Sequence, residues 1–201
     1  MFTMSRMLLA AALISVGFAA AAQTTRVRGT IESVDGNRLT VRLSDGTLAQ
    51  LILDPGSTIV AVVKASLSDI KEGTFVGSAA LPQADGTQRA LEVHIFPEEM
   101  RGVGEGHRPY APVPQSTMTN GSIAGAPVVK GVQGSTLTVK YKDGEKRIFV
   151  SPDTPIVRYV LGSTNDLKPA VRFTVAAAAK KPEGTYEVNR INVGRDGVAP
   201  P

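Results

Sequence analysis

Cysteine and tryptophan are both absent from this chain of 201 residues, and aromatic residues make up only 5% of it. Without cysteine the chain has no disulfide, no cysteine nucleophile and no cysteine that could carry a lipid. Proteins that bind nucleic acid without sequence preference stack bases on aromatic side chains, so the shortage of aromatics argues against a nucleic-acid partner. Stability must therefore come from packing of the core.

Residues for nucleophilic catalysis are also missing. The sequence has no G-x-S-x-G elbow, and its two histidines, His94 and His107, are not accompanied by a serine in a matching motif. The glycine-rich stretch 102–106 superficially resembles a dinucleotide fingerprint, but it lacks the third spacing, and prolines follow where a helix should begin. We therefore expect a protein that is not an enzyme.

Charge is mild in total and uneven along the chain. Residues 23–201 carry 21 Lys and Arg against 18 Asp and Glu, an excess too small to indicate nucleic acid. Residues 28–96 hold 6 basic and 8 acidic side chains, whereas residues 120–197 hold 12 basic and 7 acidic. A basic second half could meet anionic lipid head groups, envelope polysaccharide or the first half of a neighbour, although an ordinary solvated surface explains the same counts.

The first 22 residues are typical of a secretory signal peptide. Arg6 supplies a basic region, Met7 to Phe18 is apolar, and Ala20-Ala-Ala22 is a small-residue cleavage site. The apolar run is short for a membrane span of about 20 residues, and no later stretch is long enough. We expect cleavage near Ala22 and a periplasmic protein without a transmembrane span; an uncleaved N-terminal anchor is the alternative.

An internal repeat organises the rest of the chain. Leu39 to Gly46 (LTVRLSDG) recurs as Leu137 to Gly144 (LTVKYKDG), and Asp69-Ile-Lys matches Asp166-Leu-Lys at nearly the same offset. Matches that keep their spacing over about 60 residues indicate a tandem duplication. Two copies are too few for a solenoid, so each copy is expected to bury its own core.

The repeat and the composition predict four segments. These are a signal peptide (1–22), a first β domain (23–96), a linker rich in proline and glycine (97–120) and a second β domain (121–201). The linker has no hydrophobic periodicity, and a connection of that length is either a functional loop or a tether. We expect it to pack partly along the groove between the domains.

Alternation of apolar and polar residues predicts strands throughout both copies. Leu39, Val41 and Leu43 would face inward, as would Leu137, Val139 and Tyr141 in the second copy. Asp54-Pro-Gly56 and Ser151-Pro-Asp153 are expected to break the pattern, because proline cannot donate to a ladder.

A single helical turn capped by Ser66 should follow the third strand. The order β-β-β-short helix-β-β in each copy predicts an all-β protein of two tandem five-stranded OB-like barrels. A five-stranded sandwich or a looser meander is the alternative.

A metal site is the most specific chemical hypothesis. Glu92, His94, Glu105 and His107 lie within sixteen residues, and carboxylate with imidazole suits Zn²⁺ or another divalent ion. Thioethers are soft ligands, so Met100 and Met118 could instead join His107 in binding Cu(I). Glu92 and His94 share one face of a strand, but the others lack a recognised ligand spacing, and an exposed polar face running into an acidic loop is the competing interpretation.

The two copies, with their Asp-Gly turns and the Asp-Ile/Leu-Lys element, resemble small OB-like domains of unknown function in exported bacterial proteins. The segments Met100-Arg-Gly-Val-Gly-Glu-Gly-His107 and Ser116-Thr-Met-Thr-Asn120 also resemble those of short proteobacterial periplasmic proteins of this type. Some of these are called metal ABC transporter permeases, a role that requires a polytopic membrane protein and does not suit this sequence. The resemblance implies an OB-like fold and a periplasmic location, and it identifies no catalytic or binding residues.

Together these observations predict a non-catalytic periplasmic module that binds a ligand or another envelope component. An envelope protein or polysaccharide is the expected partner, and no cofactor is expected. The alternative is a periplasmic protein that binds a divalent metal or copper through the His/Glu cluster.

Overall fold

A computed structural model describes residues 24–129 and 134–201, so the expected signal peptide lies outside the described residues. The protein is all-β, and no helix within the described ranges is long and apolar enough to cross a membrane. The strands are β1 (Thr24–Asp35), β2 (Arg38–Leu43), β3 (Leu48–Lys64), β4 (Phe75–Pro82), β5 (Gln88–Ile95), β6 (Gly106–Pro109), β7 (Thr117–Ile123), β8 (Val128–Val129), β9 (Ser135–Tyr141), β10 (Gly144–Val150), β11 (Ile156–Leu161), β12 (Arg172–Lys180) and β13 (Tyr186–Gly194). Single 3-10 turns are η1 (Leu67–Asp69), η2 (Glu98–Met100) and η4 (Thr164–Asp166).

Five strands close into a barrel, which we call ring one. β1 pairs with β2, β2 with β3, β3 in parallel with β13, β13 with β12, and β12 returns to β1. Its interior brings Ile31, Leu39 and Leu51 from the first copy together with Phe173 and Ile191 from the second. Burying each of these side chains stabilises the fold by about 1.5 to 3 kcal/mol.

A second cycle of pairings, ring two, joins β4, β5, β10, β9 and β7. β4 pairs with β5 and β7, β9 with β7 and β10, and a short parallel ladder between β10 and β5 completes the cycle. Inside it, Val76 and Val93 of the first copy pack in one cluster with Leu137, Val139 and Ile148 of the second. The predicted inward positions Leu39, Val41, Leu137 and Val139 are therefore confirmed, and Leu43 packs partly buried against the core of ring one.

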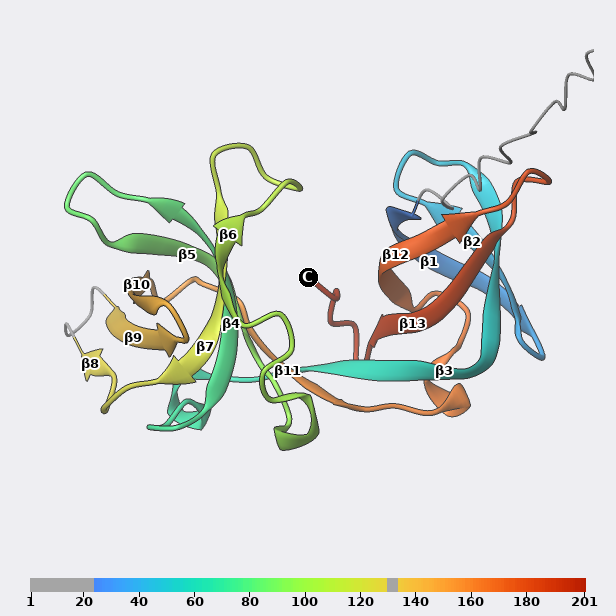
Figure 1. Cartoon of the computed structure of the whole chain (residues 1–201). Helices are drawn as coiled ribbons and strands as arrows, with labels where there is room; N and C mark the ends of the chain where they lie inside the picture. Colours follow the sequence, from blue (N-terminus) through green and yellow to red (C-terminus); the bar gives the residue numbers. More distant parts are fainter. Residues whose placement is uncertain (1–23, 130–133) are drawn as a thin grey trace, which may run out of the picture.

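Each ring thus contains strands from both copies. The first three strands of the first copy are completed by β12 and β13, and β7, β9 and β10 are completed by β4 and β5. Figure 1 shows the exchange as two lobes, each containing colours from distant parts of the sequence. The expectation that each copy buries its own core is wrong, because alternation of apolar residues shows which face of a strand is buried but not which strand covers it.

The exchange depends on β3, which has 17 residues and runs past the end of ring one. At about 3.3 Å per residue it spans roughly 55 Å, more than a small barrel needs. Its C-terminal half pairs with β11, and Figure 1 shows these two strands passing between the lobes. The chain therefore enters ring two before it forms β4.

The expected break at Asp54-Pro-Gly56 is wrong for the first copy. The register between β3 and β13 steps from Leu53↔Val188 to Thr58↔Arg190, so the proline segment bulges out of the ladder while the strand continues. Pro55 is tolerated because no ladder hydrogen bond is required of it there. The corresponding break in the second copy is confirmed, since β10 and β11 are separate strands.

The range predicted to be a linker contains η2, β6 and the first residues of β7. β7 is strand one of the second copy, and a repeat that sequence reasoning missed marks it: Gly29-Thr-Ile31 of β1 recurs as Gly121-Ser-Ile123. Both glycines lie against the backbone of strand two, because an added Cβ would be 2.0 Å from the carbonyl oxygen of Arg42 at Gly29 and 2.3 Å from that of Lys140 at Gly121.

The predicted helical turn after the third strand is confirmed in both copies as a 3-10 turn. At η1 the Ser66 backbone N–H donates to the Asp69 carboxylate at 2.8 Å, and at η4 Ser163 donates to Asp166 at the same distance. Each carboxylate also pairs with an arginine, Arg158 for Asp69 and Arg195 for Asp166. These bonds hold the connection between the third and fourth strands of each copy.

A third apolar cluster lies where the lobes meet. Val60 and Val62 of β3 and Tyr159 of β11 pack there with Phe75 and Phe96, and Val198 packs against the cluster. The segment 195–201 runs between the lobes, where Figure 1 places the C-terminus. The two rings are therefore joined by packing as well as by strand exchange.

Candidate functional site

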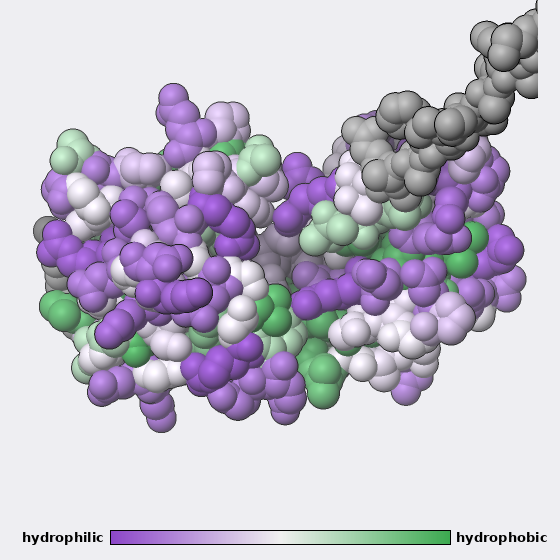
Figure 2. Space-filling view, in the orientation of Figure 1, coloured by the Kyte–Doolittle hydropathy of each residue, from purple (hydrophilic) through white to green (hydrophobic). Residues whose placement is uncertain are grey.

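A cleft with a volume of about 930 Å³ lies between the lobes. Four segments line most of it: residues 64–67 at the end of β3, residues 150–157 between β10 and β11, residues 198–201, and Glu92 of β5. The surface is hollowed between the lobes in Figure 2. A volume of this size suits a small-molecule ligand.

Glu92 is the buried carboxyl group of this cleft. Its side chain is only 21% exposed, and no hydrogen-bond donor among the described residues contacts the carboxylate. Burial raises the pKa of Glu92 to about 7, against the opposing effect of the Arg26 charge. At neutral pH the group is therefore poised between its neutral and ionised forms.

His94 lies next to Glu92 on the same face of β5 and is buried. Its ring stacks on Tyr159 with centroids 5.1 Å apart and meets the edge of Phe96 at 4.9 Å. Burial, with the positive charges of Arg108 and Arg26, lowers the pKa of His94 to about 3. His94 Nδ1 lies 4.0 Å from Glu92 Oε1 and has no hydrogen-bond partner among the described residues.

The two faces of β5 are both covered, for different reasons. Val93 and Ile95 point into ring two, while Glu92, His94 and Phe96 face the region where the lobes meet. The interpretation of Glu92 and His94 as an exposed polar face is wrong, because β11 pairs beside β5 and its Tyr159 stacks on the His94 ring. The sequence near β5 does not predict that Glu92 and His94 are shielded from solvent.

Glu105 and His107 lie elsewhere, on the β6–β7 side of ring two. Glu105 Oε1 accepts from the Lys142 backbone N–H at 3.0 Å, and His107 Nδ1 is 2.9 Å from Thr119 Oγ1. The His107 ring also stacks on Tyr141, which is half-buried rather than inside the core as expected. Burial and the Lys146 charge lower the pKa of His107.

The strand register keeps the two histidines apart. His94 is paired with Gly77, Gly77 with Asn120, and Asn120 with Gly106, so β4 and β7 lie between β5 and β6. Three spacings between neighbouring strands, each about 4.8 Å, put the backbones of β5 and β6 roughly 14 Å apart. The donor atoms of two ligands of one zinc ion lie within about 4 Å of each other. Among residues 24–129 and 134–201, no group of three or more His, Asp or Glu side chains is arranged to hold a metal ion. Metal binding by Glu92, His94, Glu105 and His107 stays a prediction.

Gly77 of β4 lets the His94 ring lie against the sheet. A Cβ at this position would sit 2.1 Å from His94 Nε2 and 2.6 Å from Asn120 Oδ1. The His94 ring cannot move aside without losing its packing against Tyr159 and Phe96. Gly77→Ala is therefore expected to lower the free energy of unfolding by about 2 kcal/mol, measured by urea denaturation.

The matched control is the same substitution in a His94→Ala background. Without the ring the shorter contact disappears and only the contact with Asn120 Oδ1 remains, so the added cost of Gly77→Ala should fall to about 1 kcal/mol or less. Additive effects of the two substitutions would show that Gly77 is required for another reason.

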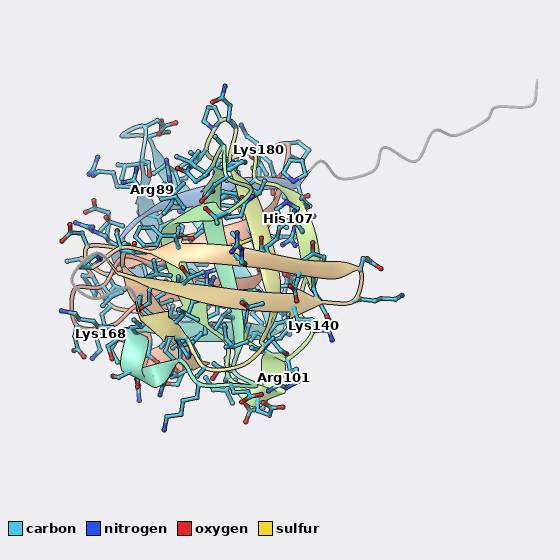
Figure 3. All side chains as sticks on the ribbon, turned by 90° about the vertical axis from the view of Figure 1, so that its left-hand side faces the viewer. Arg89, Arg101, His107, Lys140, Lys168 and Lys180 are labelled. Carbon is cyan, nitrogen blue, oxygen red and sulfur yellow. The ribbon has the colours of Figure 1, made fainter. Side chains whose placement is uncertain are left out.

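Strand exchange also redistributes the charge. Ring-one residues 24–57 and 163–201 together carry 10 basic and 8 acidic side chains, and residues 65–155 carry 9 and 10. The basic second half of the sequence therefore does not become a basic lobe. In Figure 3 the labelled cations Arg89, Lys140 and Arg101 stand apart from one another on the lobe that faces the viewer, whereas Lys168 and Lys180 belong to the ring-one segments.

Sequence reasoning found Glu92 and His94 but missed the residues that surround them. Tyr159, Arg26 and the segment 195–201 come from regions far along the chain, and the repeat does not indicate that they meet β5. Arg26 donates to the Pro201 carbonyl at 2.9 Å and lies over the ring of Tyr110, which joins the edge of ring one to ring two.

Comparison with protein-family models, curated proteins and solved structures found no match.

Proposed function

We propose that this chain is a non-catalytic binding module of the periplasm and that its ligand, a small and largely apolar molecule, occupies the cleft between the lobes. The observation that carries the proposal is the cleft itself, about 930 Å³, with the largely buried carboxyl group of Glu92 in its wall. Concave and mostly apolar sites with a few polar groups are the usual form of small-molecule sites. Export rests on the signal-peptide pattern of residues 1–22.

We also propose that both rings are OB-like barrels. The strand order of each copy supports this, together with a 3-10 turn between strands three and four. In both rings strand one pairs with strand four and strand three pairs in parallel with strand five, which are the crossed connections of a Greek-key barrel. The proposed ligand site lies between these barrels and not on the outer face of either.

A neutral, apolar fluorescent dye such as Nile red tests the proposed function. One dye molecule per chain is expected to bind with a rise in fluorescence. Ala199→Trp places a large ring at the exposed wall of the cleft and should weaken binding by at least about tenfold, because it removes apolar area that the dye would bury.

The control is Ala177→Trp, which adds the same side chain at an exposed position of β12. It should leave dye binding unchanged. The proposal is wrong if no dye binds, or if the two tryptophan variants have the same effect.

A further inference from the structure

The cleft holds one largely buried carboxyl group that the described residues leave without a hydrogen-bond partner. The Glu92 carboxylate receives no hydrogen bond from the described residues, and His94, whose Nδ1 lies 4.0 Å from Glu92 Oε1, is buried and neutral. A buried carboxylate without a donor costs free energy, and a partner within hydrogen-bond reach would relieve that cost. Glu92 is also not fully enclosed, since a fifth of its side chain remains accessible.

The described groups that face Glu92 from other elements do not donate a hydrogen bond to its carboxylate. Arg26 of β1 is bound to the Pro201 carbonyl and lies over Tyr110. Lys64 of β3 and Asp153 of the 150–157 connection line the same cleft, but both are exposed and opposite in sign. The pKa values of Tyr110 and Tyr159 are raised by burial, so both phenols stay neutral.

Most of the remaining wall is apolar. Leu67, Val150, Pro155, Ile156 and Val157 line the cleft on the side of ring two and β11, and residues 198–201 close it on the other side. A ligand that fits must therefore bury an apolar body and present one donor to Glu92. A carboxylate ligand would be repelled by Glu92 when it is ionised, and a purely apolar ligand would leave it unpaired.

We infer that the cleft selects apolar molecules that carry a single protonated amine, with the ammonium group donating to the Glu92 carboxylate and the hydrocarbon lying against the 150–157 wall. This inference rests on the proposed function and specifies its ligand. An ion pair of this kind, formed in a partly desolvated site, is short and charge-assisted and is stronger than a neutral hydrogen bond.

Three probes with the same chain and different head groups test the inference: decylammonium, decanol and decanoate. Calorimetric titration of the purified chain at pH 8 is expected to show decylammonium binding at least about tenfold more tightly than decanol, with decanoate weakest. The preference should shrink at pH 6, where Glu92 is more often protonated because its pKa is about 7, while the amine stays charged at both pH values.

Two variants test whether Glu92 causes the preference for decylammonium over decanol. Glu92→Gln keeps the shape of the side chain and should make the affinities of decylammonium and decanol equal. Asp153→Asn removes the other side-chain carboxylate of the cleft, at its exposed rim, and should change the decylammonium affinity by no more than about twofold. Thermal unfolding of both variants confirms that they are folded.

The outcomes separate the inference from the proposed function. Equal affinities of the three probes, or a preference that persists in Glu92→Gln, would overturn the inference and leave an apolar binding cleft in place. If none of the probes binds the wild-type chain, both the inference and the proposed function are wrong.

Discussion

A chain cut between β6 and β7 is expected to stay together as one particle. The cut would be made by inserting a protease site into residues 111–115, a loop whose side chains are mostly exposed. The two fragments should co-elute in size-exclusion chromatography at the mass of the uncut protein and separate only in denaturant. The expected effect is all or none, because neither fragment contains five strands that close a ring.

The reason is the number of ladders that cross the cut. The first fragment holds β1 to β6 and the second holds β7 to β13, and seven pairings join them: β1 with β12, β3 with β11 and β13, β4 with β7, β5 with β10 and β11, and β6 with β7. Both closed cores also draw apolar side chains from each fragment. Separation would expose both cores at once.

Uncut protein with the same insertion is the control and should unfold in urea at the same midpoint as the wild type. Two folded fragments that separate without denaturant, or two independent unfolding transitions after cleavage, would show that each copy forms its own barrel in solution. That result would contradict the strand exchange.

Removing Glu92 or His94 is expected to give the folded protein opposite dependences on pH. In Glu92→Gln the free energy of unfolding should rise by about 2 to 3 kcal/mol between pH 4.5 and pH 6.5. In His94→Gln it should fall by a similar amount over the same range. Urea denaturation at three pH values in this window measures both slopes.

The signs follow from the two pKa shifts. His94 has a pKa near 3 in the folded state and about 6.5 when unfolded, so between these values the unfolded state binds one more proton, and raising the pH favours folding. Glu92 has a pKa near 7 when folded and about 4.5 when unfolded, so between these values the folded state binds one more proton, and raising the pH disfavours folding. Each slope approaches 1.36 kcal/mol per pH unit.

In the wild type the two slopes oppose each other between pH 4.5 and 6.5, because the folded and unfolded states bind the same number of protons at this pair. Glu99→Gln, on the exposed turn η2, is the control and should keep the wild-type slope. Parallel slopes in Glu92→Gln and His94→Gln would mean that the two side chains are not held in the neutral forms that their burial favours.

Local sequence patterns were sufficient to predict most of the strands. Alternation placed Leu39, Val41, Leu137 and Val139 in cores, and the serine-capped turn after the third strand appears at η1 and η4. These features depend on neighbours a few residues away, which is the range over which strand periodicity and capping act. The repeat also identified equivalent strands, apart from β7, whose marker is the three-residue match Gly121-Ser-Ile123.

The metal hypothesis shows where sequence spacing stops being informative. Glu92 and His94 are two residues apart on one strand and do lie side by side, as strand geometry requires. Glu105 and His107 are close to them in sequence, yet β4 and β7 come between, because the chain leaves β5 and returns on the far edge of the sheet. Proximity of polar residues along the chain therefore did not predict proximity in the fold.

The sequence by itself determined an all-β chain, its duplicated strand order and the buried face of each strand. Only the tertiary structure decided which strands complete each ring and what covers Glu92 and His94. The two copies offer nearly equivalent fourth and fifth strands, so exchanged and unexchanged pairings satisfy the same apolar pattern. The length of β3 and its pairing with β11 favour the exchanged form, and this long-range pairing also creates the cleft between the lobes.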